Sequence, residues 1–220
     1  MSVQAAHAAV SGRARPDPGP QDREIVMPSV LVPLAPGFEE LEAITIVDLL
    51  RRAEFDVTTA GLADGPVTAS RKTVHVPDVT LDSVCERSFD LIALPGGLPG
   101  ALNLRDSEIL GSMLEAQHGR NGWIGAICAA PLVLAARGLL RERRATAFPG
   151  VLDEYADQVG EILDSPLVTD RPIVTSRGPG TAMDFALRLI ELLEGERARD
   201  RVEAGLRRPR HHTTRELPVH

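Results

Sequence analysis

The sequence has few aromatic residues, few cysteines and no long hydrophobic run, and each shortage excludes a class of protein. Aromatic residues make up 3% of the 220 residues, so aliphatic side chains must fill the core. No apolar run approaches the roughly 20 residues that a membrane-spanning helix needs. The first residues also lack the apolar region of a signal peptide. We therefore expect neither a membrane protein nor a secreted one.

Cysteine is scarce, with only Cys85 and Cys128 in the chain. One pair cannot make a disulfide framework, which favours a reducing, cytoplasmic location. Two cysteines without a histidine cluster cannot build an ordinary zinc site either. We expect a protein that works without a metal or a cofactor.

The charge is distributed unevenly along the chain. The net charge is -7, but residues 1–27 are net neutral and residues 196–220 carry +3, so residues 28–195 carry -10. An acidic body does not favour nucleic-acid binding. Both ends are predicted to be disordered, the first rich in Ala, Pro, Gly and Arg, the second rich in Arg. A single domain is predicted for residues 28–195.

Strand and helix patterns alternate within that domain. Apolar strands are predicted at residues 30–34, 55–60, 91–94, 123–127, 145–147 and 173–175, and a small hairpin at 67–76. Helices are predicted at residues 40–53, 107–117, 132–136 and 181–193. Continuously apolar strands that alternate with helices are typical of a parallel sheet covered on both faces. In such sheets, sites form at the carboxyl ends of the strands.

The most informative segment is the strand that ends at Cys128. Small residues follow it, and then a predicted helix begins. A strand that turns sharply into a helix holds its turn residue in a strained conformation, with the side chain exposed. The free N–H groups of the helix would favour thiolate over thiol. We interpret Cys128 as a nucleophile and Cys85, which lacks this context, as structural.

Two glycines follow another predicted strand, in Pro95-Gly96-Gly97. They could simply make a tight turn. If they lie beside Cys128, the backbone amides of Gly97 and Ala129 could stabilise an oxyanion.

Three glutamates, Glu39, Glu40 and Glu42, begin the first long helix. Acidic residues at a helix start complement the helix dipole, and that role alone would explain them. A glutamate near the buried face of this helix would instead meet the crevice. It could then hydrogen-bond the cysteine sulfur or act as general acid and base.

No histidine stands at an obvious position beside the predicted nucleophile. A Cys–His hydrolase is therefore poorly supported. The six histidines are His7, His75, His118, His211, His212 and His220.

Five segments in order resemble the ThiJ/PfpI superfamily, in the branch of the parkinsonism-associated deglycase (the DJ-1 branch) and its bacterial relatives. They are GFEELE at 37–42, VDLLRRA at 47–53, LPGG at 94–97, AICAAP at 126–131 and TSRGPGT at 175–181. The resemblance covers roughly residues 28–195. It implies a flavodoxin-like (class I glutamine amidotransferase-like) three-layer α/β sandwich with a mostly parallel sheet, a cysteine nucleophile elbow and a homodimeric assembly.

The resemblance also implies roles for residues of the site. Cys128 falls on the reactive cysteine, and Glu42 on the protonated glutamate that hydrogen-bonds it. Gly97 and Ala129 fall on the oxyanion-site amides.

Other matches lie around the pocket. Arg52 and Arg71 match arginines near the dimer interface and the site. Ser176, Arg177 and Pro179 match the loop that borders the pocket.

Two departures from the family pattern count against a peptidase. Phe148 stands where a family histidine often lies. Ala129 follows the cysteine, where the protease-like branch has a histidine. Glu42 is then the only evident acid or base, and Phe148 makes the expected pocket partly apolar.

We therefore predict a reactive-cysteine stress-response protein that acts on methylglyoxal-type dicarbonyls or their protein adducts, as a glyoxalase or deglycase does. The alternative is a non-enzymatic oxidative-stress sensor or redox chaperone that works through oxidation of Cys128. A transcription regulator is set aside, because neither tail shows a helix-turn-helix pattern.

Overall fold

A seven-stranded sheet forms the centre of the molecule. The computed structural model of the chain describes residues 27–208. The strand order is β10-β11-β7-β6-β1-β2-β5, and every neighbouring pair is parallel except β10 with β11. The strands are β1 (Ser29–Leu34), β2 (Asp56–Gly61), β5 (Val79–Thr80), β6 (Leu91–Leu94), β7 (Trp123–Ile127), β10 (Leu167–Asp170) and β11 (Ile173–Ser176).

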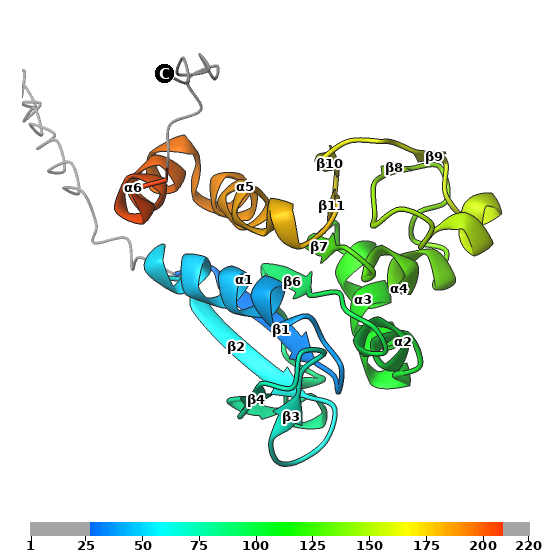
Figure 1. Cartoon of the computed structure of the whole chain (residues 1–220), viewed down its shortest axis with the longest axis horizontal. Helices are drawn as coiled ribbons and strands as arrows, with labels where there is room; N and C mark the ends of the chain where they lie inside the picture. The colour runs from blue at the N-terminus through cyan, green and yellow to red at the C-terminus, as the bar shows by residue number, and fades with distance from the viewer. Residues whose placement is uncertain (1–26, 209–220) are drawn as a thin grey trace, which may run out of the picture.

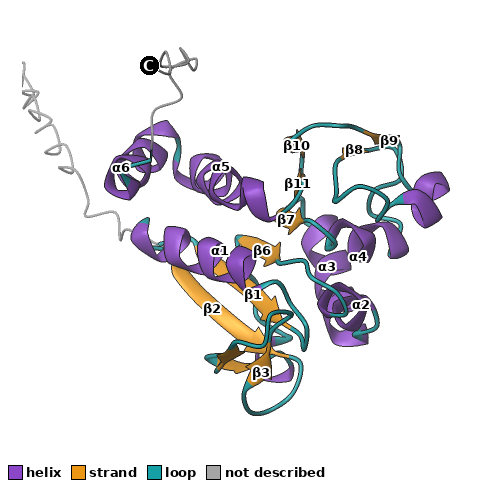
Figure 2. Ribbon diagram, viewed as in Figure 1, coloured by secondary structure: helices purple, strands orange, loops and turns teal. Residues whose placement is uncertain are grey.

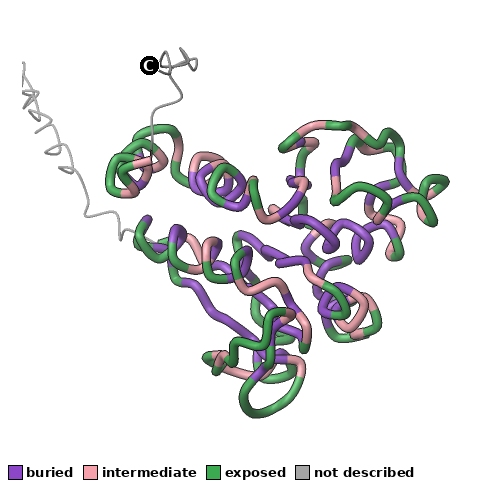
Figure 3. Tube along the Cα trace, viewed as in Figure 1, coloured by how far each residue is buried: buried purple, intermediate pink, exposed green. Residues whose placement is uncertain are grey.

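Helices cover both faces of this sheet and make three layers (Figures 1 and 2). One face packs against α1 (Glu40–Arg52), α5 (Ala182–Glu194) and α6 (Glu196–Leu206). The other packs against α2 (Gly100–Arg105), α3 (Glu108–Gly119) and α4 (Pro131–Ala136). Figure 3 shows the buried residues along the strands and on the helix faces turned toward them. Among residues 27–208, no helix has the length and apolar character required to cross a bilayer.

The start of α1 illustrates why the sequence folds this way. Ala43, Ile46 and Leu50 are at most 1% exposed and recur at helical spacing, so they form a stripe against the sheet. The helix ends where Glu54 takes a positive φ of 67°. The same periodicity puts Glu42 on the buried side, where it is 0% exposed.

Most of the predicted elements are confirmed. The hairpin is present as β3 (Val67–Thr68) and β4 (Val74–His75), which pair antiparallel. The strand predicted at 145–147 is shorter, and it lies outside the main sheet: β8 (Arg144–Ala145) pairs with β9 (Glu161–Ile162). Within residues 27–208, three short 3-10 helices complete the elements, at Asp82–Val84, Asp153–Gln158 and Pro179–Thr181.

The prediction of a disordered tail from residue 196 is wrong for its first part. Residues Glu196–Leu206 form α6, and its Ala198 and Val202 are 3% and 4% exposed within the core that α1 and α5 share. Charged residues outnumber apolar ones in this helix, and its buried face consists of only a few apolar residues, so the sequence pattern does not show it. Arg208 extends this docking by pairing with Asp184 of α5 at 2.7 Å. Residues 1–26 and 209–220, also predicted to be disordered, lie outside the described residues.

Candidate active site

Cys128 lies on a sharp turn between β7 and α4, at the carboxyl edge of the sheet. Its φ is +62°, a region that residues other than glycine rarely adopt. Two backbone hydrogen bonds hold it there. Its amide donates to the Ser176 carbonyl at 2.9 Å, and its carbonyl accepts from the Phe148 amide at 2.9 Å. The strained turn predicted from the sequence is therefore present.

Gly96 packs directly against this turn. A Cβ atom on Gly96 would lie 2.7 Å from the Ala129 nitrogen and 2.8 Å from the Cys128 Cβ. Gly97 has a φ of +87°, where glycine is favoured. The pair of glycines thus lets the segment after β6 approach the nucleophile turn closely.

Glu42 reaches the same place from α1. Its Oε2 accepts a hydrogen bond from the Gly96 amide at 2.8 Å. Its Oε1 is buried and has no well-formed hydrogen bond within residues 27–208. The Cys128 thiol is close enough to interact with this carboxyl group, and each shifts the pKa of the other.

Burial raises the pKa of both groups. For Glu42, burial and the nearby charge of Glu39 outweigh the hydrogen bonds from Gly96 and Cys128, and the pKa rises to about 7. For Cys128, burial and the Glu42 carboxylate raise the pKa to about 12, although the amides of Gly97 and Ala129 lower it. Loss of the first proton from such a pair suppresses loss of the second. The pair therefore carries about one negative charge just above neutral pH.

The expectation of an exposed thiol biased to thiolate by a helix is wrong. Cys128 is only 9% exposed, and α4 is a helix of six residues. The burial of Cys128 and its carboxylate neighbour outweigh the amides at the sulfur.

The other two glutamates of this segment have a different role. The Glu40 carboxylate accepts hydrogen bonds from the Arg71 amide at 3.0 Å and from the hydroxyls of Ser70 and Thr73, each at 3.0 Å. The Ser70 hydroxyl lies 2.9 Å from the Glu39 carboxylate as well. Glu39 and Glu40 thus fix the β3–β4 hairpin to the start of α1.

Arg52 and Arg71 lie outside this cluster of Cys128, Glu42 and the glycine amides. Both are exposed. Arg52 pairs with Asp48 one turn earlier, at 2.7 Å. Arg71 contributes its backbone amide to Glu40.

Ser176 contacts the nucleophile turn through its backbone carbonyl, which accepts from the Cys128 amide. It is 0% exposed, and its hydroxyl bonds the Pro166 carbonyl at 2.9 Å and Thr181 at 2.6 Å. Pro179 begins the short 3-10 helix after it and is half-buried. These residues shape the loop after β11.

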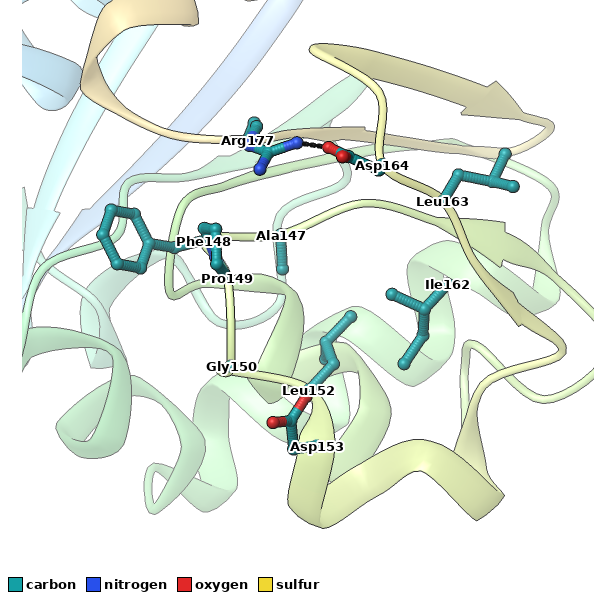
Figure 4. Close-up of a pocket in the computed structure, with 10 residues that line it drawn as sticks. All are labelled: Ala147, Phe148, Pro149, Gly150, Leu152, Asp153, Ile162, Leu163, Asp164 and Arg177. Atoms are coloured by element: carbon teal, nitrogen blue, oxygen red, sulfur yellow. Dashed lines mark ion pairs between the residues drawn. The ribbon is translucent and has the colours of Figure 1, made fainter.

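Phe148 and Arg177 border an open pocket of about 300 Å³ beside the nucleophile turn (Figure 4). Phe148 is 50% exposed, and Arg177 forms an ion pair with Asp164. Cys128 and Glu42 are not among the residues that line this pocket.

Sequence reasoning missed two contributors to the site. The sequence predicts that the glycine pair makes a tight turn or turns backbone N–H groups toward a ligand; it does not predict that the Gly96 amide donates to Glu42. Ser70 gave no signal, because a single serine in a hairpin turn is ordinary. Only the docking of the hairpin on α1 shows its contact with Glu39 and Glu40.

Comparisons with known proteins agree with this geometry. The profile of the DJ-1/PfpI family matches residues 28–192. The chain is 42% identical to the protein dj-1beta of Drosophila melanogaster over 179 residues, which are 81% of this chain and 96% of that protein. It is 40% identical to the glutathione-independent glyoxalase DJR-1.2 of Caenorhabditis elegans over 168 residues, 76% of this chain and 89% of that protein. The crystal structure of Drosophila DJ-1beta is similar, with a TM-score of 0.80 and 41% identity over 82% of this chain and 97% of that chain. The expected flavodoxin-like fold is confirmed.

Proposed function

The chain belongs to the DJ-1/PfpI family, and from this premise we propose that it converts methylglyoxal-type 2-oxoaldehydes, free or as protein adducts, to 2-hydroxy acids. The observation that carries the proposal is the contact between two buried groups, the Cys128 thiol and the Glu42 carboxyl, on a strained turn. The similarity to a relative named as a glyoxalase supports the same reaction. The reaction needs no cofactor, because it is an internal redox change with net addition of water.

The first step forms a bond between sulfur and carbon. The Cys128 sulfur attacks the aldehyde carbon while its proton goes to Glu42, which returns the proton to the new alkoxide. The amides of Gly97 and Ala129, which face the sulfur, would donate to that developing oxyanion. The product is a neutral hemithioacetal with Glu42 ionised again.

The second step moves one proton between neighbouring carbons. Glu42 takes the proton from the former aldehyde carbon, which gives an enediolate, and delivers it to the adjacent carbon, while the hydroxyl proton of the hemithioacetal passes to the former ketone oxygen. The aldehyde carbon is thereby oxidised to a thioester and the ketone carbon is reduced to an alcohol. Water then breaks the carbon–sulfur bond, which releases lactate and restores the Cys128 thiol.

Glu42 suits both steps because its pKa, raised to about 7, lies near neutral pH. A general acid and base works best when its pKa is close to the working pH. The two histidines of the described chain contribute to other regions: His75 packs edge-on against Phe38 at 5.3 Å, and His118 lies in the last turn of α3.

Lactate formation by the purified protein tests the proposal. Wild type should form lactate from methylglyoxal, and Cys128→Ser should reduce the rate to background. Cys85→Ser is the matched control, since Cys85 is exposed and should not affect turnover. Equal rates in wild type and Cys128→Ser would overturn the proposal.

The proposed assembly is a homodimer formed through α1. Leu41 and Ile44 are 52% and 47% exposed, one turn apart, and Asp48 and Arg52 continue the same stripe. Large apolar residues that repeat on one exposed helix face are typical of an interface. Light scattering should give twice the chain mass for wild type, and Ile44→Asp should give a monomer.

The proposed location is the cytoplasm. Both cysteines are free, and a reducing compartment preserves a catalytic thiol.

A further inference from the structure

Gly96 bridges two glutamates at the start of α1. Its amide donates to Glu42 Oε2 at 2.8 Å, and its carbonyl accepts from the Glu39 amide at 2.9 Å. Gly97 packs just as closely, because a Cβ atom there would collide with the Glu39 nitrogen. The segment after β6 therefore fixes Glu39 and Glu42 on either side of one residue.

The spacing of these glutamates brings their carboxyl groups near each other. Glu39 is the N-cap of α1, and Glu42 lies three residues later in its first turn. Residues three apart on a helix are neighbours, with about 5–6 Å between their Cβ atoms. The half-buried Glu39 carboxylate is also held in place, because it lies 2.9 Å from the Ser70 hydroxyl. A second negative charge is thus fixed beside Glu42.

Glu39 acts on only one member of the pair formed by Cys128 and Glu42. Burial is the main reason that the pKa of Glu42 rises, and the Glu39 charge adds to it, against the hydrogen bonds from Gly96 and Cys128. The pKa of Cys128 is raised by burial and by Glu42, but not by Glu39. Among residues 27–208, the other elements packed against α1, which are α5, α6 and the β3–β4 hairpin, add no charge that shifts the pKa of Glu42. Glu39 therefore opposes a negative charge on Glu42 more than one on the Cys128 sulfur.

We propose that Glu39 is a positioning residue that directs the proton shared by Cys128 and Glu42 onto Glu42, which leaves the negative charge of the pair on the sulfur. The S–H bond breaks and an O–H bond forms at Glu42 Oε1, the oxygen that has no well-formed hydrogen bond within the described residues. No oxidant or further reactant is needed. Because the thiolate is the nucleophile, Glu39 activates Cys128 without touching it. The catalytic consequence rests on the proposed function, whereas the position of the proton is measured without substrate.

The first test measures thiolate at Cys128 by its rate of alkylation with iodoacetamide. All proteins carry Cys85→Ser, so that the exposed Cys85 does not react. At pH 8, above the pKa of about 7 of Glu42, Glu39→Gln should lower the rate constant about threefold. This corresponds to about half a pKa unit, the repulsion between unit charges about 6 Å apart in water. Glu40→Gln is the matched control, because Glu40 also contacts the Ser70 hydroxyl but is turned toward the hairpin, and it should keep the wild-type rate.

The second test follows the Glu42 carboxyl by carbon-13 NMR of labelled glutamate. Its signal, assigned by its loss in Glu42→Gln, should titrate near pH 7 in wild type. The midpoint should fall by about half a pH unit in Glu39→Gln and stay unchanged in Glu40→Gln. Glutamine keeps an oxygen that can accept from Ser70, and urea unfolding verifies that both variants are folded.

The same alkylation rate or the same Glu42 midpoint in Glu39→Gln and wild type would overturn the role of Glu39. Equal changes in Glu39→Gln and Glu40→Gln would overturn it too, because they would reflect only the loss of an acidic charge. Neither measurement depends on turnover. Absence of lactate formation would therefore refute the proposed function, while these two readouts would still decide where Glu39 places the proton.

Discussion

Glu40 and Glu42 are two residues apart on one helix, yet their surroundings shift their acidities in opposite directions. Glu40 accepts hydrogen bonds from the turn of the β3–β4 hairpin, and despite partial burial these bonds lower its pKa to about 2. Burial raises the pKa of Glu42 to about 7. A helix rotates by about 200° over two residues, so one carboxyl faces the hairpin and the other faces the core. Their positions on the helix thus place Glu40 against the hairpin, where it stabilises the fold, and Glu42 beside Cys128, where it can transfer protons.

Removing the carboxyl groups of Glu42 and Glu40 one at a time tests whether the two glutamates differ in role. Glu42→Gln should lower the rate of lactate formation by about 10²–10⁴-fold, because it removes the proton carrier. Glu40→Gln keeps a hydrogen-bond acceptor at the hairpin and should stay within a few fold of wild type. Similar losses in both variants would show that the two glutamates do not differ in role.

The pH profile of the activity should show the same division. Glu42 must be ionised to accept a proton, so kcat/KM should fall about tenfold per pH unit below a pKa of about 7. Glu40 stays ionised down to about pH 2, so Glu40→Gln should leave this profile in place. A profile that moves in Glu40→Gln would contradict the assignment. Initial rates in a constant-ionic-strength buffer series make the measurement.

Stability should depend on pH with opposite sign for the two groups. The lowered pKa of Glu40 gives stability that is present above pH 4.5 and is lost as the pH falls through about 2. The raised pKa of Glu42 gives stability that is full below pH 4.5 and is lost as the pH rises through about 7. At pH 7, Glu40→Ala should lower the free energy of unfolding by about 1–3 kcal/mol, the effect of losing charge-assisted hydrogen bonds. Urea unfolding from pH 3 to pH 8 measures both slopes, and Glu42→Gln should remove the loss toward pH 7.

The smallest effect is expected at Ser70, which contacts Glu39 and Glu40 but not Glu42. The Ser70 hydroxyl has one proton, so it donates a hydrogen bond to only one of these two carboxylates at a time, and Ser70→Ala removes that bond. It should lower the free energy of unfolding by about 0.5–1.5 kcal/mol and leave kcat/KM within a few fold. Arg71→Ala is the matched control, because Glu40 bonds the backbone amide of Arg71. A tenfold loss of activity in Ser70→Ala would mean that the hairpin takes part in catalysis.

The sequence was sufficient for the parts of the fold that depend on local periodicity. The strands of the parallel sheet are short apolar runs, and α1 shows its buried stripe directly. The helix α6 was missed because only Ala198 and Val202 are buried among many charges, and the partner surface on α1 and α5 cannot be read locally. The antiparallel β10 was missed for a similar reason, since its pairing with β11 is set by the intervening turn.

For the candidate site, too, some features could be predicted from the sequence and others could not. Motif order indicated Cys128 and Glu42, and the structure brings the two together with Gly97 and Ala129. Burial of Cys128 could not be predicted, because it results from Gly96, Ser176 and Phe148 closing around the turn from three other segments. The alternative of an oxidation sensor stays a prediction; the raised pKa of Cys128 makes its thiolate depend on the proton held by Glu42.

Gly96 sets a limit on how this protein can diverge. A side chain there would collide with backbone atoms of Ile127 and Ala129 at 2.7 Å, whereas a Cβ on Gly119 would meet nothing within 4 Å. In a saturation library selected for activity, position 96 should return glycine alone and position 119 should return many residues. Ile162, at the exposed rim, lies between these extremes. Substitutions should therefore be tolerated at exposed positions such as 162, whereas the contact between the Glu42 carboxyl and the Cys128 thiol requires glycine at position 96.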